Sequence, residues 1–358
     1  MKIALISLGS TSSKWTAEAL EKYFDQVEVL NLKDIEINIS GKQSEVLYQG
    51  KPIGKYDCIF VKGSFRYAPL LRSITLLLSK ESYMPLKASS FTIGHDKLLT
   101  HLRLQQFGIP MPTTYLSATT KAAKGILGKV NYPIIMKFPQ GTQGKGVLVA
   151  DSYASASSML DALTALNQPF LIQEFIETGG TDIRAFVVGD KVVAAMKRKA
   201  NIHEVRSNIH AGGTGEAVEL DSYAKKIAID AARAVGAEIC GVDIMESAKG
   251  PLVIEVNLSP GLQGIYQTTK IDVAGEIAKY LHMRTVEVKK DFNTNGTTQM
   301  LKELDNGKSK EIISQLDFRG TRILLPEVIT KIAKFKESDD VHITAKTNKI
   351  VLEKLDVK

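Results

Sequence analysis

The stretch CGVDIMESAKGPLVIEVN, residues 240–257, holds two apolar runs on either side of a Ser-Ala-Lys-Gly turn. Runs of this length flanking a glycine-containing turn predict a β-hairpin. Glu255 and Asn257 are two residues apart and share one strand face, and Asp243 falls opposite or diagonal to them on the partner strand. Two carboxylates and an amide on one patch suit Mg²⁺ or Mn²⁺. The alternative is a solvated strand face with scattered polar residues.

A glycine-rich segment upstream joins two further apolar runs, residues 132–138 and 146–150. Lys137 ends the first run, so we expect its ammonium group to point into a cleft, where a polyanion would compensate its desolvation. The glycines would let backbone N–H groups approach phosphate closely, and they are Gly141, Gly144 and Gly146. A P-loop runs from strand to helix, so this strand–loop–strand order excludes one. The alternative is an ordinary turn that contains several glycines and has no binding role.

Composition narrows the class of protein. The chain has 358 residues, 44% of them apolar, which predicts a globular protein of two or three domains. The formal net charge of +7 favours an acidic substrate or partner. The two cysteines, Cys58 and Cys240, are far apart and indicate core thiols, neither a disulfide framework nor a zinc site. The first apolar run is too short for a signal peptide or membrane span, so we expect a cytoplasmic protein that does not bind membranes.

The pattern of apolar runs predicts an α/β and α+β protein with three parts. Residues 1–93 alternate short strands with helices and read as an α/β domain with a mostly parallel sheet. Residues 94–288 read as two α+β subdomains, about 113–178 and about 179–288. Residues 289–358 read as a polar linker followed by a small β-α-β-β module.

The order of these motifs resembles the ATP-grasp ligases, and more narrowly the RimK-type α-L-glutamate ligases. The resemblance covers residues from about 94 to 283. It is carried by HDKLLTHLRLQQFGIPMP, MKFPQGTQGKGV, LIQEFIETGGTDIRAFVVGDKVVAAMKRKA, RSNIHAGGTGEAVEL and GVDIMESAKGPLVIEVNLSPGLQGIYQTTKIDVAGEIAKYL. The C-terminal module resembles the AbrB-type swapped-hairpin half-domain, which implies pairing between copies. We therefore expect a homo-oligomer. Some units of this type bind DNA, and packing unrelated to that family is a further alternative, but we expect no nucleic-acid partner.

The resemblance implies two ATP-grasp subdomains that hold ATP behind a pre-ATP-grasp N-terminal domain. The nucleotide-binding residues that it implies are Lys97, Lys137, Gly141, Gly144, Gly146, Glu174, Phe175, Asp182, Arg206, Ser207 and Asn208. Of these, Lys137, Arg206 and Asn208 would act on the reacting groups. Two divalent ions, Mg²⁺ or Mn²⁺, would bind to Asp243, Glu255 and Asn257. The substrate would contact Arg184, Arg198, Ser259 and Gly261, although the two arginines could equally be solvated hairpin charges.

The implied reaction is the ATP-dependent joining of a carboxylate to an amine through an acyl phosphate. The implied amine is L-glutamate, and the acceptor is a protein C-terminus, a coenzyme or an amino acid, with an acidic protein favoured by the basic net charge. Two alternatives stay open. One is a carrier-protein-linked amino-acid ligase of the lysine and arginine biosynthesis type, and the other is a non-catalytic ATP-sensing regulator with a DNA-binding tail.

Overall fold

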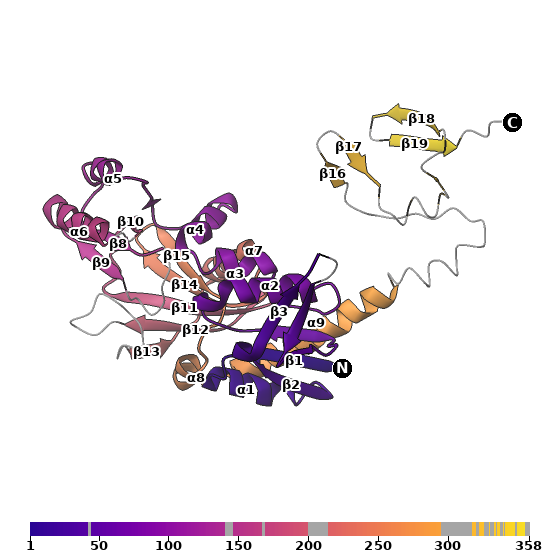
Figure 1. Ribbon diagram of the computed structural model, residues 1–358. Helices are drawn as coiled ribbons and strands as arrows, with labels where there is room; N and C mark the ends of the chain where they lie inside the picture. Colours follow the sequence, from indigo (N-terminus) through magenta and orange to yellow (C-terminus); the bar gives the residue numbers. More distant parts are fainter. Residues whose placement is uncertain are drawn as a thin grey trace. The chain divides into compact units, whose positions relative to one another are not determined.

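A computed structural model gives the structure of the chain (Figure 1). The described residues are 1–41, 44–139, 146–166, 169–199, 214–294, 317–319, 322–325, 329, 333, 335–336, 339, 341–347 and 349–354. The chain divides into two compact units, Met1–Glu287 and Val288–Lys358. No helix of the described residues is long and apolar enough to cross a membrane.

The N-terminal region contains the parallel sheet that the sequence predicts. Its strands are β1 (Lys2–Ser7), β2 (Gln26–Asn31) and β6 (Cys58–Val61), in the spatial order β2-β1-β6. Both pairings are parallel, so all three strands end at the same edge of the sheet. Helix α1 (Thr11–Leu20) begins just past the end of β1, where the Ser10 side chain caps it by accepting from the Ser13 N–H.

A second, antiparallel sheet in this region was not anticipated. It consists of β3 (Ile35–Ile39), β4 (Ser44–Tyr48) and β5 (Lys51–Pro52). In its β4–β5 turn, Gln49 and Gly50 both adopt positive φ, which glycine accommodates readily. Helices α2 (Ala68–Leu78) and α3 (Ala88–Ile93) complete the region.

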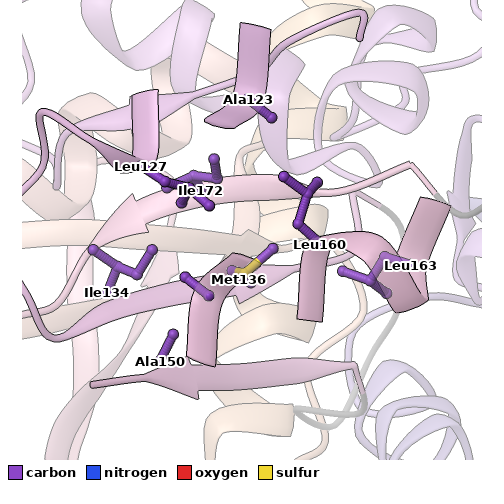
Figure 2. Close-up of a cluster of buried hydrophobic side chains, with 9 residues drawn as sticks. Ala123, Leu127, Ile134, Met136, Ala150, Leu160, Leu163 and Ile172 are labelled. Carbon is purple, nitrogen blue, oxygen red and sulfur yellow. The ribbon is translucent and has the colours of Figure 1, made fainter. Parts of the chain in front are cut away.

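The next part is a four-stranded sheet covered by two helices. Its strand order is β7-β10-β8-β9, and every pairing is antiparallel. The strands are β7 (Thr114–Tyr115), β8 (Ile134–Lys137), β9 (Val147–Ala150) and β10 (Leu171–Glu174), and the helices are α5 (Thr120–Leu127) and α6 (Tyr153–Ala165). Figure 2 shows the apolar side chains of both helices meeting those of the sheet. Since β8 and β9 are neighbours, the glycine segment joins two paired strands, as predicted.

A five-stranded antiparallel sheet carries the quoted hairpin. Its order is β13-β12-β11-β14-β15. The strands are β11 (Thr181–Val188), β12 (Lys191–Lys199), β13 (Thr214–Ala217), β14 (Ile239–Ser247) and β15 (Gly250–Asn257). The hairpin predicted from residues 240–257 is confirmed as β14 and β15, and β11 and β12 form a second hairpin. The accompanying helices are α4 (Lys97–Gln106), α7 (Ser222–Val235), α8 (Gln263–Thr269) and α9 (Val273–Thr294). Helix α7 buries an alanine-rich face, so it packs closely against this sheet.

The C-terminal part differs from its prediction in two details. Helix α9 continues to Thr294, into residues that we expected to be linker, because its sequence has no glycine or proline between Gly275 and that point. The first strand expected in the β-α-β-β module is replaced by two paired strands, β16 (Asp317–Arg319) and β17 (Arg322–Leu324). The predicted final hairpin is present as β18 (Val341–Lys346) and β19 (Lys349–Lys354).

Candidate active site

The hairpin of β14 and β15 brings the three predicted metal ligands together. Asp243 lies directly opposite Glu255, and Gly241 lies opposite Asn257. The Asn257 Nδ2 donates to Asp243 Oδ2 at 3.3 Å. The register shifts next to Asp243, where a β-bulge interrupts the ladder. Two carboxylates and one amide therefore converge on one patch, the geometry that the spacing predicts.

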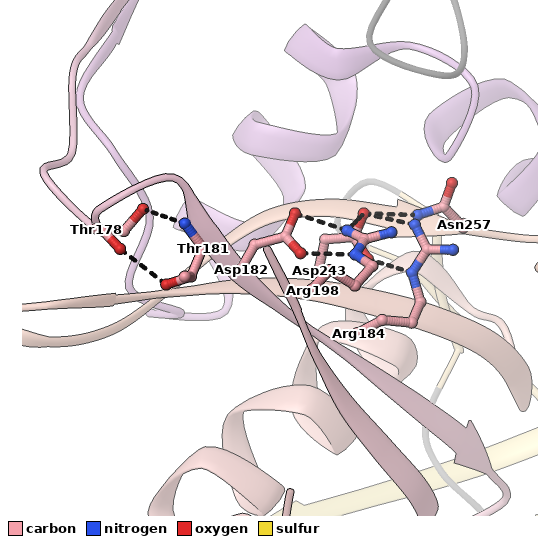
Figure 3. A network of polar contacts seen from close by, with 7 residues as sticks. All are labelled: Thr178, Thr181, Asp182, Arg184, Arg198, Asp243 and Asn257. Atoms are coloured by element: carbon pink, nitrogen blue, oxygen red, sulfur yellow. Dashed lines mark hydrogen bonds and ion pairs between the residues drawn. The ribbon is translucent and has the colours of Figure 1, made fainter. Parts of the chain in front are cut away.

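Asp243 is the centre of a buried ionic network that sequence spacing did not predict (Figure 3). Arg184 lies directly opposite it across β11 and β14 and donates to both of its carboxylate oxygens, with the Nη2 bond to Oδ2 at 2.7 Å. Arg198 Nη2 lies 3.0 Å from Asp243 Oδ2. Burial acts to raise the pKa of the Asp243 carboxyl, but the two guanidinium groups outweigh it and the pKa is lowered. Asp243 is therefore ionised.

Arg198 links this cluster to Asp182. The two residues lie opposite each other on β11 and β12, and the guanidinium donates to both Asp182 oxygens at 2.6 Å. Both side chains are almost fully buried. The donors of Arg184 and Arg198 thus contact protein carboxylates, and the substrate role that we expected for these arginines stays a prediction.

Lys97, Lys137 and Glu255 influence one another electrostatically. Burial lowers the pKa of Lys137 to about 8, with a contribution from the charge of Lys97 that Glu255 opposes. Burial and the neighbouring Asp243 raise the pKa of Glu255, which both lysines oppose. A carboxylate whose pKa is raised and two cations therefore share one region, which suits a ligand carrying both phosphate and metal ions.

A chain of buried and half-buried polar side chains orients Lys137. Its ammonium donates to Gln173 Oε1 at 2.8 Å, and Gln173 Nε2 donates to the Thr114 hydroxyl at 2.7 Å. That hydroxyl lies 2.9 Å from Nδ1 of His101, whose Nε2 lies 3.3 Å from the Ile254 carbonyl. A carbonyl can only accept, so His101 carries its proton on Nε2, and burial lowers its pKa to about 4. The network extends from β8 to the strand that holds Glu255.

At the C-terminal end of the glycine segment, position 146 requires glycine. Gly146 has φ of +78°, and a Cβ atom there would lie 2.1 Å from the Phe138 ring. The N–H of Phe138 donates to the Gly146 carbonyl at 3.2 Å, and the N–H of Lys97 donates to the Pro139 carbonyl at 3.0 Å. The segment therefore starts beside Lys97. Gly141 and Gly144 lie outside the described residues, as do Arg206, Ser207 and Asn208.

Glu174 and Phe175, predicted to contact the nucleotide, lie at the end of β10. The N–H of Glu174 donates to the Thr113 carbonyl, and its carboxylate accepts from the Thr113 N–H at 3.2 Å. Glu174 is exposed, and Phe175 is half-buried. Both are therefore accessible to a ligand, and their nucleotide role stays a prediction.

A cavity of about 330 Å³ adjoins the hairpin. Lys97, Glu255 and Asn257 line one part of it, together with the predicted substrate residues Ser259 and Gly261. Residues of the N-terminal region line another part, and they are Leu8, Ser10, Ser12, Ser13, Lys62, Gly63, Ser64 and Phe65. Lys62 is a cavity residue that the sequence analysis missed. The available signal was a lysine at the end of a buried strand, the same signal that singled out Lys137.

The hairpin patch fits a divalent metal by its donor chemistry. Within the described residues, no group of three or more His, Cys, Asp or Glu side chains is arranged for a metal, so the protein ligands here would be the two carboxylates with the Asn257 amide as the third oxygen donor. Glu255 lines the cavity, and its raised pKa indicates a carboxylate that a cation would stabilise. Asp243 already accepts from two arginines and Asn257, so a metal would share this carboxylate with them.

Comparison with known proteins identifies the family. The RimK-like ATP-grasp domain matches residues 94–281. The chain belongs to the RimK-like ATP-grasp family. A "Probable alpha-L-glutamate ligase" of Picosynechococcus sp. is 37% identical over 289 residues, which cover 78% of this chain and 95% of that protein. The protein of the same description from Serratia proteamaculans is 37% identical over 292 residues, covering 79% and 96%.

Solved structures of known proteins share the ATP-grasp fold with this chain. A RimK domain protein of Sphaerobacter thermophilus superposes with a TM-score of 0.61 at 20% identity, covering 78% of this chain and 99% of that one. The ATP-grasp ligase PsnB, in complex with a minimal precursor, Mg and ADP, gives a TM-score of 0.62 at 17% identity, covering 79% and 98%. This ATP-grasp protein is therefore a ligase that joins a carboxylate to an amine, in a family that uses ATP and Mg²⁺.

Proposed function

We propose that this ATP-grasp ligase adds L-glutamate to the carboxylate of an acceptor that is itself acidic. The observation that carries the proposal is the similarity to proteins described as probable α-L-glutamate ligases, which extends over more than three quarters of the chain. The site supports it, because the cavity beside the hairpin joins a cationic region to a second, hydroxyl-rich wall. The basic net charge of +7 also favours an acidic acceptor.

In the proposed reaction, the acceptor carboxylate attacks the γ-phosphorus of ATP in line, which gives an acyl phosphate and ADP. The glutamate amine then attacks the acyl carbon, an amide bond forms, and inorganic phosphate leaves. Lys97 and Lys137 would stabilise the negative charge of the phosphates, since both are cationic and lie near the carboxylates of the hairpin. Loss of one such contact commonly costs about 3 kcal/mol of transition-state stabilisation.

Asp243, Glu255 and Asn257 would hold Mg²⁺, or Mn²⁺ in its place, as two ions. The metal would supply charge neutralisation at the phosphates when bound. Arg184 and Arg198 would keep Asp243 ionised, because the two guanidinium groups lower its pKa. The hydrogen-bonded chain from Gln173 to His101 would hold the Lys137 ammonium in position.

The remaining predicted residues complete the proposal. The glycine segment that ends at Gly146 would cover the triphosphate, and Glu174 with Phe175 would contact ribose and adenine. Arg206, Ser207 and Asn208 would approach the transferring phosphoryl group. Ser259 and Gly261 would contact the acceptor, because both line the cavity.

The proposal is tested by incubating the full chain with ATP, MgCl₂, L-glutamate and candidate acceptors. The candidates are L-glutamate itself, L-Glu-L-Glu and a protein with an acidic C-terminus. We expect ADP and phosphate in equal amounts and a mass increase of one or more glutamyl units on an acceptor. Hydroxylamine, added in place of glutamate, should trap the acyl phosphate as a hydroxamate. ATP hydrolysis that no acceptor stimulates would contradict the proposal.

A further inference from the structure

Lys62 directly follows strand β6 and is only 5% exposed. Its backbone N–H donates to the Ile6 carbonyl at 2.8 Å, and its side chain lines the cavity. Within the described part of the chain, its ammonium group has no hydrogen bond or ion pair, and it lies 5.7 Å from the centroid of the Phe60 ring. A desolvated cation without a counter-ion is costly, so this position is suited to an anion from outside the protein.

The position of Lys62 in the sheet is where open α/β sheets bind ligands. The chain passes from β1 to β2 on one side of β1, whereas β6 lies on the other side, so the strand order reverses at β1. Ligands of such sheets bind outside the carboxyl ends of the strands at this reversal. Both β1 and β6 end at the cavity, where Leu8 and Lys62 are among the lining residues.

Helix α1 also begins at this wall. The N–H groups of a first helical turn have no partner within the helix, and they carry a partial positive charge. Ser10, Ser12 and Ser13 from this turn line the cavity, and its first turn contains no acidic residue. A buried ammonium and a helix N-terminus therefore face the same space, and both favour an anion.

Three hydrogen bonds join this N-terminal wall of the cavity to the segment that follows the hairpin of β14 and β15. The N–H of Gly63 donates to Ser259 Oγ at 3.1 Å. The Ser12 hydroxyl accepts from the N–H of Leu262 at 2.8 Å and donates to Gln263 Oε1 at 3.3 Å. The anion-favouring wall and the hairpin thus line one continuous cavity. A substrate reaching from one to the other would be held at two points.

Lys62 lies with the N-terminal residues that line the cavity, whereas Lys97 and Glu255, which line its other part, belong to α4 and β15. Lys97 and Glu255 act on the pKa of Lys137, whereas the pKa of Lys62 is lowered to about 8 by burial. The cavity also contains a neutral imidazole, because burial lowers the pKa of His95 to about 4, and its Nε2 atom is buried without a partner among the described residues. An anion at Lys62 would therefore occupy a different wall of the cavity from phosphates held beside Lys97 and Glu255.

We propose that Lys62 and the first turn of α1 form a binding site for a substrate carboxylate that does not itself react. The site would make the enzyme select substrates with a second carboxylate close to the reacting group. This inference rests on the proposed ligation of acidic substrates. The carboxylate has two possible sources, the acceptor and the incoming amino acid, and both present the same chemistry to Lys62.

The test measures binding without ATP, by isothermal titration calorimetry on the full chain. The probes are L-Glu-L-Glu and L-Glu, each compared with its amide counterpart, L-Gln-L-Gln and L-Gln. The wild-type protein should bind at least one carboxylate probe about tenfold or more tightly than its amide. Discrimination with the dipeptide pair alone assigns the site to a peptide acceptor. Discrimination with the single amino acid shows that one free glutamate fills the site, and it assigns the site to the incoming amine if L-glutamate does not serve as an acceptor in the ligation assay. A wild-type protein that binds amide and carboxylate probes equally overturns the proposal.

Substitutions of Lys62 distinguish the loss of its charge from a loss of folding. Lys62→Met should abolish the discrimination, Lys62→Arg should retain part of it, and Lys33→Met, at an exposed lysine of the same region, should leave it unchanged. Thermal denaturation should show that Lys62→Met still folds, because methionine removes a charge that has no described partner. Retention of wild-type discrimination by a folded Lys62→Met protein overturns the proposal.

Steady-state kinetics provide a second measurement, which distinguishes the carboxylate site at Lys62 from the proposed glutamate-ligase function. Lys62→Met should raise KM for the carboxylate substrate about tenfold while KM for ATP stays unchanged. A rise confined to KM for ATP would place Lys62 at the phosphates and overturn the inference. If no glutamyl product forms but wild-type protein discriminates the probes and Lys62→Met does not, the proposed function fails and the carboxylate site stands.

Discussion

Replacing Lys137 by methionine should stabilise the protein while removing its response to ATP. Lys137 is 7% exposed, and its pKa falls from 10.5 to about 8. The difference of about 2.5 units, at 1.36 kcal/mol per unit, corresponds to about 3.4 kcal/mol of stability lost when the ammonium is charged. Methionine also loses the hydrogen bond to Gln173, about 1 kcal/mol. The variant should therefore be about 2 kcal/mol more stable at pH 7.

The stability difference should depend on pH with a defined sign. The folded chain releases the Lys137 proton near pH 8, whereas the unfolded chain keeps it up to about pH 10.5. Between these values the unfolded state binds more protons, so wild-type stability rises with pH relative to the variant. The advantage of Lys137→Met should be complete below about pH 8, should fall as the pH rises, and should reverse slightly as the pH approaches about 10.5, where only the lost hydrogen bond of about 1 kcal/mol remains.

Urea denaturation of both proteins from pH 7 to pH 10.5 measures this difference in the free energy of unfolding. Titrating groups that both proteins share contribute equally to the two values, so they cancel in the difference. Lys129→Met serves as the control because Lys129 is exposed in the same region. Saturating ATP and Mg²⁺ should stabilise wild type by about 2.7 kcal/mol at 100 times Kd and should leave Lys137→Met unchanged. A variant less stable than wild type at pH 7, or a stability difference independent of pH, would refute the assigned burial and charge of Lys137.

Three further substitutions test other parts of the site. Glu255→Gln should abolish ADP formation while the circular dichroism spectrum stays that of wild type, and normal turnover would remove Glu255 from the metal site. Gly146→Ala should lower Tm and ATP affinity because its Cβ would overlap the Phe138 ring, whereas Gly125→Ala, in an open helical position, should be neutral or stabilising. Arg198→Met should lower the free energy of unfolding in urea by about 3–5 kcal/mol, because it leaves buried carboxylates with fewer partners, and a loss below about 1 kcal/mol would contradict the network.

Local sequence patterns predicted much of the fold correctly. The apolar runs that became β1, β8, β14 and β15 are short and bounded by turn residues, so their strands could be recognised without tertiary information. The small antiparallel sheet from Ile35 to Pro52 was missed because its strands are half exposed and lack a continuous apolar run. The short strands β16 and β17 were merged into one for a related reason, since only Gly320 and Thr321 separate them in the sequence.

The sequence by itself determined which side chains share a strand face, because the alternation of a β-strand is local. Glu255 and Asn257 had to lie on one face, and Lys137 had to end a buried strand. Tertiary structure alone decided that Arg184 lies opposite Asp243, because β11 and β14 are far apart in the chain and their register is set by packing. It also decided that Lys62 is buried at the cavity, because burial depends on which distant segments cover a residue.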